Sequence, residues 1–344
     1  MKGEGRDVHV RDEKYLSVAG LTKSFGGVAA VDALSLGVAR GEILALLGPS
    51  GSGKTTTLRL LAGFEVPDAG TITVDGEDVT RTAPAARRFG MVFQHYALFP
   101  HLDVGQNVSF GLAASGEAAA RRVREVLAMV DLAGYERRPV TALSGGQQQR
   151  VAVARSLAPE PRVLLLDEPL SNLDPSLRER TRRELRRAIK QVGITTVFVT
   201  HEQEEAFELG DRIAVLSAGH LEQVGTADEL YDEPRTAFVA GFVGRAAALP
   251  GERVEGAVRA GARALVRPEA MRFVPLAGAA LQGVVTERRF VGAQAYFTVD
   301  AGAGAVFDVQ APHGAVRVGE RVGVAVDRVL FWDRTDAPTH GRTE

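Results

Sequence analysis

One glycine-rich segment constrains the fold of this chain more than any other feature of its sequence. Residues 48–55 read GPSGSGKT and fit the pattern G-x-x-x-x-G-K-[ST]. The apolar residues 43–47 predict a buried strand before the segment, and residues 56–64 predict a helix after it. Because a strand, this loop and a helix in this order form a phosphate-binding loop, the sequence predicts nucleotide binding in an α/β fold.

The residue types in the loop suit a polyphosphate and its metal ion. Glycines let the backbone approach the phosphates, and the N–H groups at the start of the helix point at the anion. Lys54 adds a positive charge, and the Thr55 hydroxyl can bind Mg²⁺. A glycine-rich turn that binds nothing is the alternative, and the complete pattern makes it the weaker one. We expect these residues to contact the nucleotide: Gly48, Ser50, Gly51, Gly53, Lys54, Thr55 and Thr56.

The composition excludes several other classes of protein. The chain has 344 residues, enough for two or three domains, and a net charge of -2 gives it no overall attraction to nucleic acid or anionic lipid. It contains no cysteine, which excludes disulfides, thiol catalysis and cysteine-ligated zinc. No apolar run approaches the roughly twenty residues that span a bilayer. We therefore expect a soluble protein that reaches a membrane only through partners.

Polar side chains follow three further predicted strands. Residues 162–166 predict a strand whose four consecutive apolar residues, 163–166, end in Asp167 and Glu168. Asp167 suits a magnesium site, and Glu168 suits a residue that orients and deprotonates an attacking water. Gln94 follows the strand 88–93, and His201 follows the strand 194–200. Since the carboxyl ends of parallel strands meet at one edge of a sheet, Gln94 is a candidate for Mg²⁺ or the water and His201 for the γ-phosphate, rather than ordinary solvated side chains.

Residues 96–160 lack strand patterns and predict a helical insert. Within it, residues 143–150 read LSGGQQQR, in which Ser144 suits a helix N-cap and two glycines expose backbone N–H groups. This second helix N-terminus suits a second anion, so a two-fold pair of chains could enclose two nucleotides. Asp174 suits the N-cap of a later helix. That helix carries many arginines, but Glu179 and Glu184 interleave them, so we expect a solvated face and no nucleic-acid partner.

These motifs together resemble the ATP-binding subunits of ABC transporters. The resemblance covers residues 16 to about 240 and includes the phosphate-binding loop, the glutamine of the Q-loop, the LSGGQ signature, the Walker B strand, the D-loop at 171–174 and the switch histidine. It implies a homodimer that sandwiches two ATP molecules with Mg²⁺. It implies catalysis by Glu168 with His201, Gln94 and Lys54, metal binding by Thr55, Gln94 and Asp167, and adenine stacking on Phe25. Across the dimer it implies contacts from Ser144 and Gly146, and it adds Gln147 and Asp174 to the nucleotide-binding residues.

The resemblance also implies a domain order. We expect a flexible segment 1–15, a P-loop (RecA-like) ATPase core with an antiparallel β subdomain and a helical subdomain at 16–244, and a disordered tail at 335–344. Between them, residues 245–334 alternate in short apolar segments and predict a small antiparallel barrel. The segment Val266-Arg267-Pro268-Glu269 and residues 322–326 make it similar to the OB-like TOBE domain. A ligand-free stability or dimerisation domain is expected over a ligand sensor.

A TOBE-like domain implies solute import rather than export. The resemblance implies two integral-membrane permease subunits, an extracytoplasmic solute-binding protein, and a position at the cytoplasmic face of the cell membrane. It favours ferric ion or polyamines over sulfate, molybdate or sugars. An exporter subunit, a soluble non-transport ABC ATPase and a nucleotide-binding module without hydrolysis are the alternatives. The single phosphate loop disfavours a translation-associated ATPase, which carries two such modules, and the intact catalytic set disfavours a non-hydrolysing module.

Overall fold

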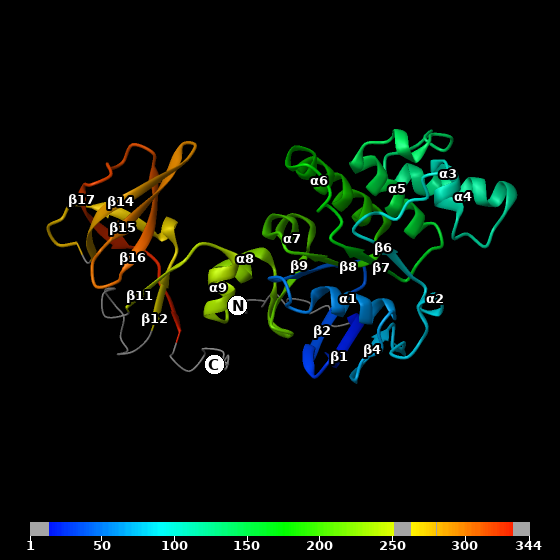
Figure 1. Ribbon diagram of the computed structural model, residues 1–344, viewed down its shortest axis with the longest axis horizontal. Coiled ribbons are helices and arrows are strands. Elements are labelled where there is room, and N and C mark those ends of the chain that lie inside the picture. Colours follow the sequence, from blue (N-terminus) through cyan, green and yellow to red (C-terminus); the bar gives the residue numbers. More distant parts are fainter. Residues whose placement is uncertain (1–13, 251–262, 280, 333–344) are drawn as a thin grey trace, which may run out of the picture. The chain divides into compact units, whose positions relative to one another are not determined.

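The computed structural model describes residues 14–250, 263–279 and 281–332 (Figure 1). The chain divides into two compact units, residues 1–227 and 228–344, which are described separately. The expected flexible segment 1–15 lies mostly outside the described residues, and its last two residues already belong to the first strand, which begins at Lys14. The expected disordered tail 335–344 lies outside them altogether.

The first unit is built on a six-stranded sheet. Its strands are, in spatial order, β10 (His220–Gly225), β9 (Arg212–Ser217), β3 (Ile43–Leu47), β8 (Thr195–Thr200), β7 (Val163–Asp167) and β6 (Phe89–Val92). All pairs are parallel except β10 with β9. Strands β3 and β8 are buried along their whole length, as continuous apolar runs require when both faces of a sheet are covered. The predicted parallel sheet is therefore confirmed.

A second sheet packs on the same core. It is antiparallel, in the order β2 (Val28–Ala39), β1 (Lys14–Phe25), β4 (Ala69–Val74) and β5 (Glu77–Asp78). Its inward side chains share one hydrophobic cluster with those of β3, β7, β8 and the helix that follows β3. The predicted antiparallel segment before the phosphate loop is thus confirmed, and it holds that loop from one side.

The helices of the first unit lie around the six-stranded sheet (Figure 1). They are α1 (Lys54–Ala62), α2 (Pro84–Arg87), α3 (Val104–Ser109), α4 (Gly116–Met129), α5 (Gly145–Leu157), α6 (Pro175–Val192) and α7 (Gln203–Leu209). Helix α1 begins two residues before the predicted start because Gly53, in a left-handed conformation, is its N-cap. Helix α3, in the predicted helical insert, ends at Ser109; Gly111, a poor helix former, follows its C-cap residue Phe110.

The structure contradicts the predicted exposure of one residue of helix α6. The arginine face of this helix was predicted to be solvated, yet Arg182 is only 3% exposed. It forms ion pairs with Glu208 at 2.9 Å and Glu204 at 3.6 Å, both from α7. The prediction was wrong here because the carboxylates that cover this face come from an element about twenty residues further along the chain.

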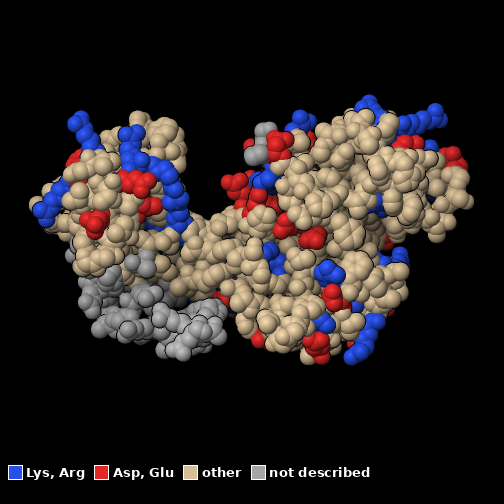
Figure 2. Space-filling view, in the orientation of Figure 1, with Lys and Arg blue, Asp and Glu red and all other residues tan. Residues whose placement is uncertain are grey.

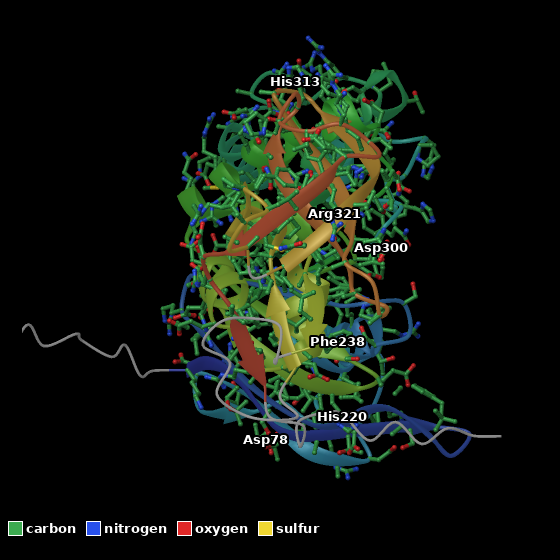
Figure 3. The ribbon with its side chains drawn as sticks, turned by 90° about the vertical axis from the view of Figure 1, so that its left-hand side faces the viewer. Asp78, His220, Phe238, Asp300, His313 and Arg321 are labelled. Atoms are coloured by element: carbon green, nitrogen blue, oxygen red, sulfur yellow. The ribbon has the colours of Figure 1, made fainter. Side chains whose placement is uncertain are left out.

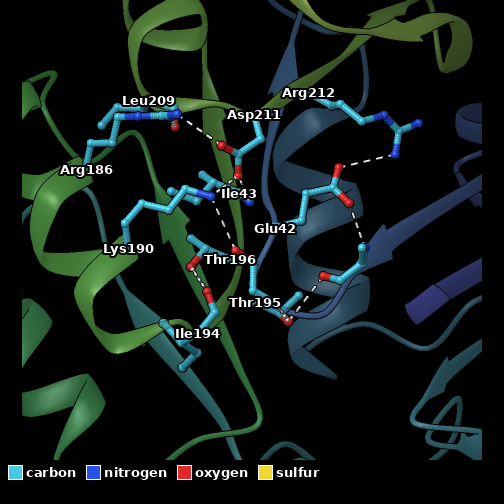
Figure 4. Close-up of polar contacts among 12 residues, drawn as sticks. Glu42, Ile43, Arg186, Lys190, Ile194, Thr195, Thr196, Leu209, Asp211 and Arg212 are labelled. Atoms are coloured by element: carbon cyan, nitrogen blue, oxygen red, sulfur yellow. Dashed lines mark hydrogen bonds and ion pairs between the residues drawn. The ribbon is translucent and has the colours of Figure 1, made fainter. Parts of the chain in front are cut away.

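The same face of α6 is tied to the start of β3. Arg186 and Lys190 both contact the carboxylate of Asp211, which also accepts a hydrogen bond from the Ile43 backbone at 2.8 Å (Figure 4). One carboxylate therefore satisfies two cations and one strand N–H group. This cluster fixes α6 to the amino edge of the sheet.

Arg87 is a buried cation that organises the end of α1. It is 1% exposed and donates hydrogen bonds of 2.7 to 2.9 Å to four backbone carbonyls. Two of these carbonyls, at Leu60 and Leu61, are in the last turn of α1, where carbonyl groups lack partners within the helix. The guanidinium therefore anchors the helix that carries the phosphate loop.

The second unit contains all the predicted C-terminal strands. Helices α8 (Ala227–Asp232) and α9 (Ala237–Val243) lead to a three-stranded sheet of β11 (Ala247–Pro250), β12 (Arg263–Val266) and β18 (Leu330–Trp332). A five-stranded sheet has the order β13 (Met271–Val274), β17 (Arg321–Val326), β14 (Leu281–Val291), β15 (Gln294–Asp300) and β16 (Val306–Pro312). Figure 3 labels Asp300 at the end of β15 and Arg321 at the start of β17. All pairs are antiparallel around one apolar core, as predicted.

Candidate functional site

The phosphate loop has the tight backbone that its glycines predicted. A Cβ on Gly48 would stand 2.3 Å from the Leu216 carbonyl oxygen, and a Cβ on Gly53 would stand 2.3 Å from the Ala30 carbonyl oxygen. Gly53 also has φ 94°, which side-chain-bearing residues rarely adopt. No larger residue fits at either position without moving the neighbouring strands. The loop is thus shaped by the sheet and by β2 together.

Lys54 is folded onto its own loop. Its ammonium donates to the carbonyl oxygens of Gly48 at 2.8 Å and Pro49 at 2.9 Å, and its side chain is 6% exposed. Burial lowers the pKa of Lys54, and the negative charge of Glu168 partly opposes that effect. Glu168 follows β7, which belongs to the same parallel sheet as β3, so the loop and the end of β7 share the carboxyl edge of that sheet, as predicted.

Gln94 and His201, two side chains that the sequence singled out, both contact the carboxylate of a third, Glu168. Glu168 accepts a hydrogen bond from Gln94 Nε2 at 3.2 Å, and its other oxygen lies 3.1 Å from His201 Nδ1. Gln94 follows β6, Glu168 follows β7 and His201 follows β8, three adjacent strands of the sheet. Glu168 itself has φ 44°, a left-handed conformation uncommon for this residue type. Such geometry at a carboxylate beside a phosphate loop is typical of a functional site.

The neighbouring Asp167 suits a divalent cation. Burial and the charge of Glu168 raise the pKa of Asp167, so its negative charge is destabilised in the fold. A metal ion relieves that destabilisation. A hydroxyl from Thr55, an amide oxygen from Gln94 and a carboxylate oxygen from Asp167 are the hard donors that Mg²⁺ prefers. Thr55 lies exposed in the first turn of α1, which leaves its hydroxyl accessible.

Asn172 belongs to the site, although the sequence assigned it no role. Its side-chain amide donates to the Gln94 carbonyl oxygen and lies 3.2 Å from His95 Nδ1. Ser171 Oγ donates to the Glu168 carbonyl oxygen at 3.0 Å. Asn172 links the segment after β7 to the segment after β6, and Ser171 holds the segment after β7 to itself. Their place within the D-loop segment 171–174 was the available signal, but their partners lie up to 78 residues away in the chain.

The second expected phosphate site starts at α5. Ser144 is the N-cap, and it exchanges two hydrogen bonds with Gln147, so the predicted cap is confirmed as a capping box. A Cβ on Gly146 would meet Thr181 Oγ1 of α6 at 2.8 Å. Asp174 is the N-cap of α6 and accepts from the Leu177 N–H group at 3.0 Å. Figure 1 shows α5 away from α1, with β6 and β7 between them. The two anion sites of one chain are therefore separate.

Phe25 is placed where an aromatic ring can stack on a ligand. It ends β1 and is 48% exposed, and the Lys23 ammonium lies 5.4 Å from the ring centroid. Gly26 and Gly27 follow it in left-handed conformations. The turn thus presents the ring outward instead of packing it into the core.

The described residues of the first unit carry both signs of charge on the face that Figure 2 shows. In Figure 2, Lys and Arg side chains alternate with Asp and Glu over the first unit. Across the described parts of the chain, no helix has both the length and the apolar character needed to cross a membrane.

Comparisons with known proteins agree with this geometry. The family model for the ABC transporter matches residues 31–171, and the model for the TOBE domain matches residues 264–329. The cbiO1 subunit of Clostridium perfringens, part of an ABC transporter complex, superimposes with a TM-score of 0.60 at 29% identity over 64% of this chain and 92% of its own. A dimeric bacterial ABC transporter cassette gives a TM-score of 0.53 at 32% identity over 61% and 98%.

Three curated relatives extend the similarity. The sulfate/thiosulfate import ATP-binding protein of Caulobacter vibrioides is 52% identical over 72% of this chain and 75% of its own. The spermidine/putrescine import ATP-binding protein of Acidothermus cellulolyticus is 44% identical over 92% and 89%. The Fe(3+) ions import ATP-binding protein of Haemophilus influenzae is 44% identical over 81% and 86%. With these relatives and both family models, the chain belongs to the ATP-binding subunits of ABC transporters that carry a TOBE domain.

Proposed function

We propose that this chain hydrolyses ATP to ADP and phosphate and thereby powers the import of a solute through an ABC transporter. The observation that carries the proposal is the contact of Glu168 with both Gln94 and His201 beside the phosphate loop. Such an arrangement supports hydrolysis rather than nucleotide binding alone, because a carboxylate and two water- or phosphate-orienting groups converge where the γ-phosphate would lie.

Each residue of the site then has a role. Glu168 accepts the proton of the attacking water, while Gln94 and His201 orient the water and the γ-phosphate. Lys54 exchanges its carbonyl contacts for the stronger, charge-assisted contact with phosphate oxygens. Thr55, Asp167 and Gln94 hold Mg²⁺, which neutralises charge on the phosphates. Phe25 stacks on the adenine ring.

Two copies of the chain complete two sites. In the proposed homodimer, Ser144, Gly146 and Gln147 of the partner subunit cover the γ-phosphate, and Asp174 borders the same interface. The separation of α5 from α1 within one chain supports this arrangement, since one chain cannot enclose one nucleotide with both. The dimeric cassette of similar fold supports it further.

The dimer would act at a membrane. We propose that it binds two integral permease subunits at the cytoplasmic face and receives solute from an extracytoplasmic binding protein. The relatives are named for sulfate/thiosulfate, spermidine/putrescine and Fe(3+) import, so the choice among these solutes stays open. The preference for ferric ion or polyamine remains a prediction, because other subunits select the solute.

The Glu168→Gln variant tests the proposal. It keeps size and hydrogen bonding but removes the base, so we expect unchanged ATP binding and a loss of roughly 10²- to 10⁴-fold in kcat. Gel filtration with ATP should show the variant as a dimer. Glu160→Gln, at the amino end of β7, is the matched control and should hydrolyse ATP like the wild type. A Glu168→Gln variant with wild-type turnover, or one that stays monomeric at high concentration with ATP, contradicts the proposal.

A second experiment identifies the complex in which the chain works. The chain is purified from gently solubilised membranes of its own source, with ATP present and with the Glu168→Gln substitution to hold the complex closed. Recovery of polytopic subunits supports import, and a co-purifying solute-binding protein names the solute class. Recovery of soluble partners alone, with ATPase activity intact, contradicts the transport role but not the hydrolysis.

A further inference from the structure

Glu205 is a buried carboxyl behind the nucleotide site. It lies in the first turn of α7 and is 2% exposed. Its Oε2 accepts a hydrogen bond from Thr200 Oγ1 at 2.5 Å. Thr200 ends β8 and directly precedes His201, and its Oγ1 also accepts from the Glu202 N–H group at 3.0 Å. Thus one hydroxyl, held by Glu205, joins the residues on both sides of His201.

His201 needs support from its backbone. Its side chain is 52% exposed, and the contact with Glu168 at 3.1 Å is the one that orients the ring. An exposed ring with one hydrogen-bond contact among the described residues keeps its direction only if the residues beside it are fixed. Thr200 supplies this rigidity, because it is 1% exposed and bonded on two sides.

Charged groups from several elements face the Glu205 carboxyl. Arg178 and Arg182 of α6 attract its negative charge, whereas Glu202 repels it. The charge of Glu205 also acts on the hydroxyl of Tyr96, in the segment after Gln94. Among the described residues, Glu205 Oε1 and the Tyr96 hydroxyl are both buried without a hydrogen-bond partner.

Burying a carboxyl group at this position lowers the stability of the fold. Removing a carboxylate from water costs several kcal/mol unless partners compensate, and only one of the two oxygens here has a partner. An apolar side chain would fill the same space at lower cost. The hydrogen bond to Thr200 is what a smaller or apolar residue could not supply.

We propose that Glu205 is a positioning residue for His201, acting through the hydroxyl of Thr200. The inference rests on the proposed role of His201 in hydrolysis and adds the residue that holds it. Glu205 touches neither nucleotide nor water; it fixes the carboxyl end of β8, so that the imidazole meets Glu168 and the γ-phosphate in the productive geometry.

Steady-state ATPase kinetics test this assignment. Glu205→Ala and Thr200→Val each remove one partner of the hydrogen bond and should lower kcat roughly 3- to 30-fold, with KM for ATP nearly unchanged. Glu205→Gln and Thr200→Ser keep the acceptor and the hydroxyl, and should stay within about 3-fold of wild type. Glu204→Ala, whose carboxylate is exposed on the same helix, is the matched control and should leave kcat unchanged.

A second background separates positioning from a general loss of structure. In a His201→Ala chain, Glu205→Ala and Thr200→Val should cause no further loss of kcat, because their effect passes through the missing ring. A further loss there, or wild-type kcat for both single variants while His201→Ala is impaired, overturns the inference alone. Wild-type turnover in His201→Ala or in Glu168→Gln overturns the proposed site itself.

Discussion

Replacing Glu205 with glutamine should make the first unit more stable at alkaline pH. Burial, opposed in part by the hydrogen bond from Thr200, raises the pKa of Glu205 from 4.5 to about 7. The folded chain therefore binds this proton more tightly than the unfolded chain. By linkage, the free energy of unfolding is highest below pH 4.5 and falls as the pH rises toward 7. At about 1.4 kcal/mol per pKa unit, the full effect is on the order of 3 kcal/mol.

Scanning calorimetry without nucleotide measures this effect. Between pH 5.5 and 8.5 the carboxyl accounts for about 2 kcal/mol of lost stability, and for a unit of this size that corresponds to roughly 4–8 °C in Tm. Glutamine stays neutral across the range, so the Tm of Glu205→Gln should rise relative to wild type by this amount as pH increases. Glu179→Gln, which removes an exposed carboxylate of α6 that pairs with Arg183 and not with Arg182, should keep the wild-type pH dependence. Parallel Tm curves for wild type and Glu205→Gln would refute the reasoning.

Three further predictions follow from the loop and its supports. Gly53→Ala should abolish ATP binding in a fluorescent-nucleotide titration, because the added Cβ would meet the Ala30 carbonyl oxygen. Gly51→Ala has open space around the added Cβ but a φ of 78°, so it should lower the free energy of unfolding by only about 1–2 kcal/mol. Phe25→Ala should weaken ATP binding roughly 5- to 10-fold without lowering Tm, whereas Phe25→Trp should preserve the affinity; equal affinities for all three chains would exclude stacking. Arg87→Met should lower the free energy of unfolding in urea by about 3 kcal/mol or more, since four carbonyl groups lose their donor, and a smaller loss would show that water replaces it.

Most of the candidate site was predictable because its signals are local. The strand before the phosphate loop, the N-caps Ser144 and Asp174, and the polar residues after three strands all depend on neighbours within a few positions. A capping hydrogen bond joins residues three apart, so its pattern is visible in the sequence. The rule that carboxyl ends of parallel strands share one edge then placed Gln94 and His201 together near Glu168.

Sequence patterns could not predict which charged side chains are buried, or which residues far apart in the chain contact each other. The sequence places Arg182 on a charged helix, and only α7 shows that it is enclosed. No local sequence pattern indicates that Asn172 contacts the Gln94 carbonyl oxygen, because Gln94 lies 78 residues away in the chain. Glu205 reads as an ordinary helical carboxylate until the structure places it behind Thr200.

The residues alone thus predict the chemistry of the chain, with a loop for phosphates, a base and an anion-binding helix start, and they predict an appended β domain. Tertiary structure decides the electrostatic state of these groups and what holds them in place. The physical reason is that hydrogen-bond caps and hydrophobic periods are set by adjacent residues, whereas desolvation depends on every element packed around a side chain. That is why Lys54, Asp167 and Glu205 acquire their perturbed pKa values only in the fold.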